Sequence, residues 1–152
     1  MRKLIVVGSS INPSPGKFTY SPKRTLFSPE ERFRQTIFTI NSLRNCFPTS
    51  KIVIVDSSDE YKEYQSLFKF FKNVDFIPLK ELSGEAYEIA NKNINKSVCE
   101  SVLLNAYYRQ YKKEILQRSN NSFLFLFAYL TSFSSQLPLL PLHLPLPLPS
   151  RL

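Results

Sequence analysis

Glycine, cysteine and histidine are scarce in this chain of 152 residues, and their scarcity excludes several kinds of site. With only three glycines, the chain contains neither of the phosphate-binding motifs GxGxxG and GxxxxGK[ST]. Its two cysteines, Cys46 and Cys99, lie too far apart in sequence for the CxxC spacing of a zinc site. His143, the only histidine, is the only candidate base for a Ser-His-Asp or Cys-His triad, and it lies among prolines. The sequence therefore shows no strong catalytic motif.

The few cysteines also bear on the cellular compartment. Two distant cysteines do not make a disulfide framework, so a reducing compartment is the simpler interpretation. The apolar run at residues 4–7 is too short for the core of a secretory signal. We therefore expect a cytoplasmic protein.

Charged side chains are almost absent after Ser119, which divides the chain into two regions. Residues 1–118 carry 19 basic and 12 acidic side chains, a net charge of +7, and beyond them only Arg151 is charged. A basic balance of this size favours polyanionic partners, such as phosphates, nucleic acid or an anionic membrane surface, without choosing among them. We assign residues 1–118 to one domain and residues 119–152 to an apolar tail.

The tail at residues 119–152 is rich in Leu, Ser, Phe and Pro. Its five prolines between Pro138 and Pro149 block a helix and remove strand donors. The proline-free part, residues 122–137, is shorter than the roughly 20 apolar residues that span a bilayer. A disordered polyproline-type extension is therefore favoured over membrane association. A second hypothesis is a shifted reading frame after Arg118, because these residue types share pyrimidine-rich codons; the tail would then be non-native and the domain truncated.

Strands and helices are expected to alternate along residues 1–118. Short runs of β-branched residues predict buried strands, which lie at residues 4–7, 51–56 and 74–78. Helical spacing and capping signals predict helices at residues 28–47, 58–72, 84–93 and 97–117. This order predicts an α/β fold with a Rossmann-like, three-layer parallel sheet and right-handed crossovers.

Polar side chains follow the first two predicted strands. Ser9 and Ser10 come directly after the first strand, and Asp56 and Ser57 end the second. Because ligands of open α/β sheets bind outside the carboxyl ends of the strands, these residues are candidates for a phosphate or nucleotide site. The alternative is a plain junction between a strand and a capped helix, which occurs in every α/β protein.

Basic residues in the loop and helix that follow could supply charge to this site. Lys23 and Arg24 lie in the loop after the first strand, and Arg32 lies near the start of the first helix. The partial positive charge of the helix amino terminus, at Ser28, adds to theirs. Taken singly, each of these residues is better explained as ordinary surface charge, and it is their shared placement after the first strand that favours a site.

The segment Val55-Asp56-Ser57-Ser58-Asp59 resembles a strand-end signature, Val-Asp-Asp-Gly-Ser-x-Asp, of nucleotide-sugar glycosyltransferases of the GT-A fold. The block from Glu31 to Arg44 is similar to one in glycosyltransferase-like proteins, and the resemblance covers roughly residues 3–115. It implies that Asp56 contacts the base or ribose of a nucleotide-diphosphate sugar and that Ser9 and Ser10 cradle the nucleotide. It also places Glu100 near the sugar, which would be transferred to an unknown acceptor.

The chain departs from that family in the groups that perform transfer. The family's Asp-x-Asp motif holds the Mn²⁺ or Mg²⁺ ion that neutralises the leaving diphosphate, and no such motif follows a later strand here. No general base for the acceptor hydroxyl is evident either. The resemblance therefore implies an incomplete GT-A domain that binds the donor without a metal site or a full catalytic set.

A non-catalytic, basic α/β module that binds nucleic acid or another polyanion is the alternative function. Three tyrosines of the last predicted helix adjoin three basic residues and could stack on bases; the six residues are Tyr107, Tyr108, Arg109, Tyr111, Lys112 and Lys113. A solvated basic carboxyl end of an amphipathic helix explains the same cluster. Nucleic acid is therefore the less favoured partner.

Overall fold

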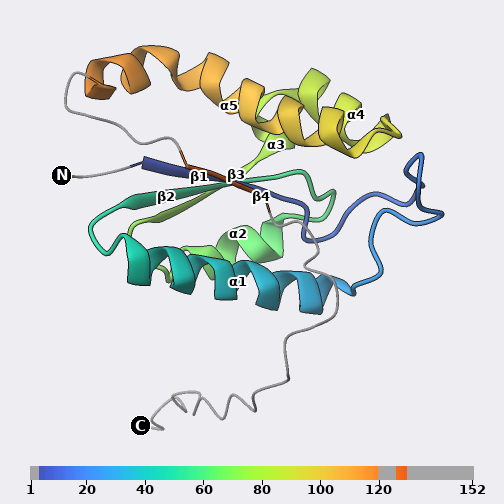
Figure 1. The fold of residues 1–152 in the computed structure, drawn as a ribbon, viewed down its shortest axis with the longest axis horizontal. Coiled ribbons are helices and arrows are strands. Elements are labelled where there is room, and N and C mark those ends of the chain that lie inside the picture. The colour runs from blue at the N-terminus through green and yellow to red at the C-terminus, as the bar shows by residue number, and fades with distance from the viewer. Residues whose placement is uncertain (1–3, 120–125, 130–152) are drawn as a thin grey trace, which may run out of the picture.

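The computed structural model describes residues 4–119 and 126–129, which form a parallel sheet covered by helices on both faces (Figure 1). The strands of the described part are β1 (Leu4–Ser9), β2 (Lys51–Asp56), β3 (Val74–Pro78) and β4 (Leu126–Tyr129). Its helices are α1 (Pro29–Cys46), α2 (Lys62–Phe68), α3 (Leu79–Leu82), α4 (Gly84–Lys92) and α5 (Lys96–Ser119). The predicted α/β class is confirmed.

The four described strands are parallel and lie in the order β3-β2-β1-β4. The chain moves from β1 through α1 to β2 and through α2 to β3, and then α3, α4 and α5 carry it back past β1 to β4. The direction of winding thus reverses between β1 and β4. This order is compatible with a Rossmann-like fold, in which ligands bind where the winding reverses.

β4 lies within the segment that the sequence analysis assigned to the apolar tail. It pairs with β1 in register from Ile5 opposite Leu126 to Gly8 opposite Tyr129. For residues 126–129 the structure thus differs from the expected disordered tail. Leu-Phe-Ala-Tyr precedes the tail's first proline and contains aromatic residues that favour strands, and it pairs with β1 after the crossover through α5. The expected polyproline segment falls at residues 130–152, outside the described residues.

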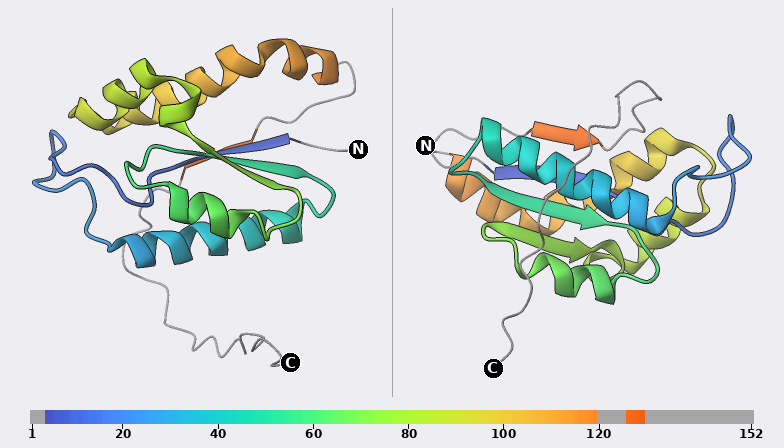
Figure 2. Two further views of the ribbon diagram at one scale, coloured as in Figure 1. Left: turned by 180° about the vertical axis from the view of Figure 1, so that it is seen from behind. Right: turned by 90° about the horizontal axis from the view of Figure 1, so that it is seen from below.

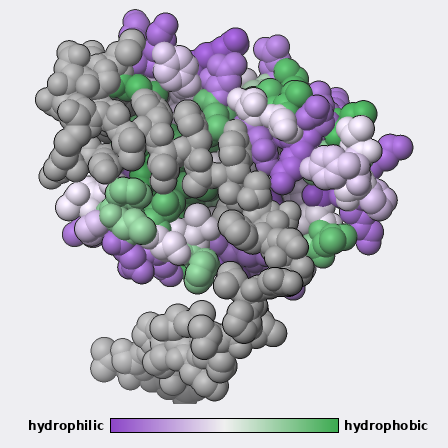
Figure 3. All heavy atoms as spheres, viewed as in Figure 1, coloured by the Kyte–Doolittle hydropathy of each residue, from purple (hydrophilic) through white to green (hydrophobic). Residues whose placement is uncertain are grey.

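Both faces of the sheet are buried, as the continuous apolar strands predict. On one face Leu4 and Val6 pack with Leu103 of α5; on the other, Ile5 packs with Ile40 of α1. Figure 2 shows α3, α4 and α5 on the first face and α1 and α2 on the second. In Figure 3, hydrophilic side chains gather along the upper rim, whereas the lower rim shows hydrophilic and hydrophobic side chains together.

The predicted start of the first helix is confirmed in detail. Ser28 caps α1 in a capping box, in which the Glu31 N–H donates to Ser28 Oγ at 3.2 Å and the Ser28 N–H donates to Glu31 Oε2 at 2.8 Å. The next helix differs from the prediction, because α2 begins at Lys62 rather than near residue 58 and ends at Phe68.

Phe68 provides a test of the packing beneath α2, because among the residues whose burial the structure describes it is the largest fully buried side chain, with 1% of its surface exposed. Its ring centroid lies 5.0 Å from that of Phe76 and 5.5 Å from that of Phe33. Phe68→Ala should lower the free energy of unfolding by about 3–5 kcal/mol in urea titrations. The matched control, Phe70→Ala, removes a ring that is 87% exposed and should change it by about 0.5 kcal/mol or less. Equal effects of the two substitutions would contradict this packing.

Candidate functional site

The carboxyl ends of β1 and β2 lie side by side and bring the predicted strand-end residues to one edge of the sheet. Ser9 pairs in register with Asp56, and the Ser57 N–H donates to the Ser9 carbonyl at 3.0 Å. Ser10 follows Ser9 directly in the chain. The structure thus places Ser9, Ser10, Asp56 and Ser57 at the edge where the parallel-sheet argument puts a ligand.

The Asp56 carboxylate is fully buried and joins the two loops that leave this edge. Its Oδ2 atom accepts the Ile11 N–H at 3.0 Å, and its Oδ1 atom accepts the Ser58 N–H at 2.8 Å. The Ser58 hydroxyl in turn accepts the Asn12 N–H at 2.8 Å. Charge-assisted hydrogen bonds of this kind offset the cost of burying a carboxylate. Both carboxylate oxygens of Asp56 thus accept backbone amides of the loops. Contact between Asp56 and a nucleotide stays a prediction.

The same turn explains why α2 begins late. Asp56 and Ser58 form an Asx turn, which holds the backbone in a non-helical conformation at this point. Asp59 is then engaged by the opposite helical layer: Tyr87 Oη of α4 donates to Asp59 Oδ1 at 2.8 Å, and Lys80 Nζ lies 3.3 Å from the same oxygen. These hydrogen bonds, that of Tyr87 first, lower the pKa of Asp59.

Arg24 fastens the long loop between β1 and α1 to the carboxyl end of α4. Its guanidinium donates to the Ala90 carbonyl at 2.9 Å and to the Asn93 carbonyl at 2.7 Å, and it lies 4.9 Å from the centroid of the Phe18 ring. The Thr19 N–H adds a backbone hydrogen bond to the Ile94 carbonyl at 2.9 Å. An arginine at the end of a helix satisfies carbonyls that lack helical partners. Arg24 therefore holds the loop in place and contributes charge at the same time.

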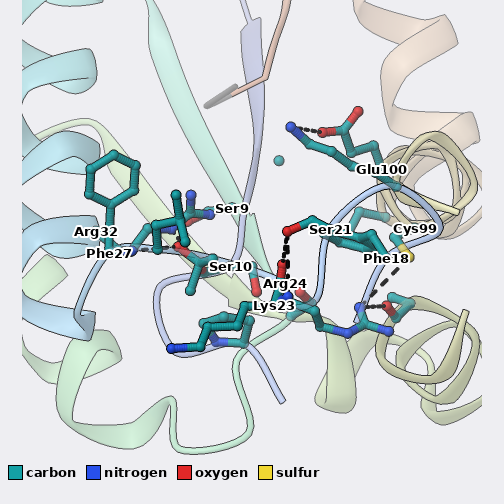
Figure 4. A pocket seen from close by; sticks show the side chains of 18 of the residues that line it. Ser9, Ser10, Phe18, Ser21, Lys23, Arg24, Phe27, Arg32, Cys99 and Glu100 are labelled. Carbon is teal, nitrogen blue, oxygen red and sulfur yellow. Dashed lines mark hydrogen bonds and ion pairs between the residues drawn. The ribbon is translucent and has the colours of Figure 1, made fainter. Parts of the chain in front are cut away.

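A pocket of about 430 Å³ lies between the end of β1, this loop and the start of α5 (Figure 4). Its basic side chains are Lys23, Arg24, Arg32 and Lys96, whereas Glu100 is its one acidic residue. Its apolar wall includes Phe18, Leu26, Phe27 and Leu103. Small-molecule sites commonly measure about 300–1,000 Å³ and combine apolar walls with a few polar groups. The size and lining of this pocket fit that description.

Most of the predicted site residues line this pocket. Ser9, Ser10, Arg24 and Ser57 do so, whereas Asp56 lies outside the lining and supports the loops. Figure 4 shows Ser9, Ser10 and Arg32 on one side, with Cys99 and Glu100 on the other. Sequence reasoning missed the apolar wall, because the loop at residues 11–27 has no periodicity from which inward-facing side chains could be identified.

Metal and membrane features are absent from the parts that the structure describes. Within residues 4–119 and 126–129, no group of three or more His, Cys, Asp or Glu side chains could hold a metal ion. The Mn²⁺ or Mg²⁺ ion implied by the resemblance therefore has no ligand set there. None of the helices in these two segments is both long and apolar enough to cross a bilayer.

The aromatic cluster of α5 is largely part of the core. Tyr107 is only 6% exposed, and its ring centroid lies 4.8 Å from that of Tyr111, which is partly buried against the same core. Only Tyr108 of the three tyrosines is exposed. Two of the three rings are therefore not free to stack on bases, so the structure offers little of the platform that the nucleic-acid alternative requires.

No family model, curated protein or solved structure matches the chain.

Asp56→Asn tests the role of the buried carboxylate. The substitution replaces one carboxylate oxygen with an NH₂ group, which only donates, so one of the two loop amides loses its acceptor. We expect a loss of about 2–4 kcal/mol of unfolding free energy. The control is Asp75→Asn on β3, whose ion pair with Lys51 at 2.6 Å is half exposed and should contribute about 0–1 kcal/mol. If both variants unfold at the same urea concentration, the buried carboxylate does not hold the loops.

Tyr87 makes the stability of the protein depend on pH. Burial, followed by the hydrogen bond to Asp59, raises the pKa of Tyr87 to about 12. A tyrosine in the unfolded chain has a pKa of about 10. The neutral Tyr87 side chain therefore stabilises the folded state fully below about pH 10, and its contribution is lost as the pH rises toward about 12. The difference in urea midpoint between wild type and Tyr87→Phe should therefore narrow over this interval. A constant difference would contradict the assignment.

Proposed function

We propose that the chain binds a nucleotide-diphosphate sugar in the pocket at the carboxyl ends of β1 and β2, as the donor-binding part of a GT-A-like glycosyltransferase. The observation that carries the proposal is the pocket of about 430 Å³ at this edge, with four basic side chains and one acidic side chain around it. A nucleotide diphosphate combines negative charge with a flat apolar base, and the pocket offers partners for both.

The position of the pocket supports this proposal. It borders Gly8, Ser9 and Ser10 at the end of β1, beside the point where the winding of the sheet reverses. Ligands of doubly wound sheets bind at that point for a physical reason: the loops on its two sides diverge and leave a crevice. The resemblance of the segment from Val55 to Asp59 to the GT-A signature agrees with a nucleotide at this edge.

The transfer reaction itself requires two further kinds of group. When an acceptor hydroxyl attacks the anomeric carbon, the bond to the diphosphate breaks and the leaving group gains negative charge, which a metal ion or basic side chains must stabilise. Among the described residues, Lys23 and Arg32 are the pocket groups suited to that task. The proposal therefore rests on donor binding and assigns no base to the acceptor.

A cytoplasmic location is part of the same proposal. Cys46 and Cys99 are both free thiols in the structure, and Cys46 is exposed. Free thiols are typical of proteins in a reducing compartment. The proposal therefore requires that nucleotide-diphosphate sugars are present in that compartment.

The test is calorimetric titration of the 152-residue protein with UDP-sugars and GDP-sugars. We expect saturable binding of at least one donor, weakened about tenfold by Lys23→Glu, because that substitution reverses a charge at the pocket. Lys17→Glu is the matched control: it lies exposed in the same loop, outside the pocket lining, and should leave the affinity unchanged.

Two results would contradict the proposal. One is the absence of binding heat for every donor, with the protein shown to be folded. The other is that the protein binds random oligonucleotides in a salt-sensitive way and does not bind nucleotide sugars. That result would favour the basic polyanion-binding module.

A further inference from the structure

The Ser9 hydroxyl is the one buried hydroxyl of the described residues without a hydrogen-bond partner. Ser9 is only 5% exposed, and it lines the pocket at the end of β1. A buried hydroxyl without a partner loses its hydrogen bonds to water and gains nothing in return. Such groups are rare in folded proteins, and this one belongs to a residue that lines a pocket, where a ligand oxygen is the partner that would satisfy it.

Other serines of the same edge show what a structural role looks like. The Ser58 hydroxyl accepts the Asn12 N–H at 2.8 Å and thereby joins two loops. The Ser28 hydroxyl accepts the Glu31 N–H and caps α1. Ser9 makes no comparable contact through its side chain, so its hydroxyl contributes nothing to the fold that an alanine would lack.

Arg32 lines the same pocket from the first turns of α1. Its Nε–H donates to the Ser10 carbonyl at 3.1 Å. Among the described residues, this is the only hydrogen bond that the Arg32 side chain makes. Its two terminal nitrogens therefore remain available to a ligand. Burial lowers the pKa of Arg32, and the negative charge of Asp56 acts in the opposite direction. The oxygens of Asp56, however, bind the amides of Ile11 and Ser58.

We propose that the Ser9 hydroxyl and the Arg32 guanidinium together form an oxyanion subsite that binds the diphosphate group of the ligand. The inference rests on the proposed function and deepens it, because it states which side of the pocket holds the phosphates. Figure 4 shows the side chains of Ser9 and Arg32 on the same side of the pocket.

The Ser9 hydroxyl and the Arg32 guanidinium both donate hydrogen bonds, which suits a phosphate group as their ligand. Phosphate oxygens only accept hydrogen bonds, and the hydroxyl and the guanidinium both donate them. The planar guanidinium matches two oxygens of one phosphate at once, and partial burial strengthens that contact relative to one in water. Lys23, on the pocket rim, adds the further positive charge that a second phosphate of a diphosphate requires.

The experiment uses inorganic pyrophosphate, titrated into the 152-residue protein in a calorimeter. We expect Ser9→Ala to weaken binding about fivefold and Arg32→Gln to weaken it at least tenfold. Ser9→Ala should also leave the urea midpoint unchanged or raise it, because it removes a buried group without a partner. Arg34→Gln, an exposed arginine of the same helix outside the pocket lining, removes the same charge and should keep the affinity within about twofold.

A second arginine variant protects the test against a failure to fold. Arg32→Lys keeps the charge but loses the planar fork, so it should bind pyrophosphate more weakly than wild type and more tightly than Arg32→Gln. Ser9→Ala is independent of the charge balance around Asp56. The comparison can therefore be made even if Arg32→Gln does not yield folded protein.

The outcomes separate this inference from the proposed function. If nucleotide sugars bind wild type, Ser9→Ala and Arg32→Lys equally well, the oxyanion subsite is wrong and the donor proposal stands. If pyrophosphate binding depends on Ser9 and Arg32 but no nucleotide sugar binds more tightly than pyrophosphate, the subsite stands and the donor proposal fails. Absence of pyrophosphate binding to folded wild type overturns the subsite.

Discussion

The buried carboxylate of Asp56 is the contact on which the whole edge of this sheet depends. It is removed from water completely, and it is stabilised by two backbone amides from different loops, those of Ile11 and Ser58. A carboxylate in that position is costly unless both oxygens are satisfied, so the two loops have few alternative paths. The end of β1 and the end of β2 are thereby fixed relative to each other.

The loop between β1 and α1 is held at two points, and the pocket lies between them. Asp56 fixes its beginning, and Arg24 fixes its later part to the carbonyls of α4. Because Asp56 and Arg24 are engaged in these backbone contacts, different side chains remain for a ligand. Those side chains, Ser9, Arg32 and Lys23, are the ones to which we assign binding of the phosphates.

The sequence predicted the features that depend on local patterns. β-branched runs indicated β1, β2 and β3, and the box from Ser28 to Glu31 indicated the start of α1. The late start of α2 was missed, because Asp56 holds Ser58 in an Asx turn and Asp59 has a partner, Tyr87, that is distant in sequence. Strand β4 was missed because four apolar residues give no period, and its pairing with β1 depends on the crossover through α5.

The sequence predicted where the site lies, but it did not predict what each of its residues does. The position of Asp56 and the serines followed from parallel strands alone. The hydrogen bonds of Asp56 to the Ile11 amide and of Arg24 to the Asn93 carbonyl, by contrast, join residues far apart in sequence and depend on the path of the loop. Amide hydrogen exchange measured by NMR tests the central claim most directly. If Asp56 joins the loops, the amides of Ile11 and Ser58 should exchange as slowly as those of β1, although both lie outside strands. Exchange at the rate of an open loop would contradict the account.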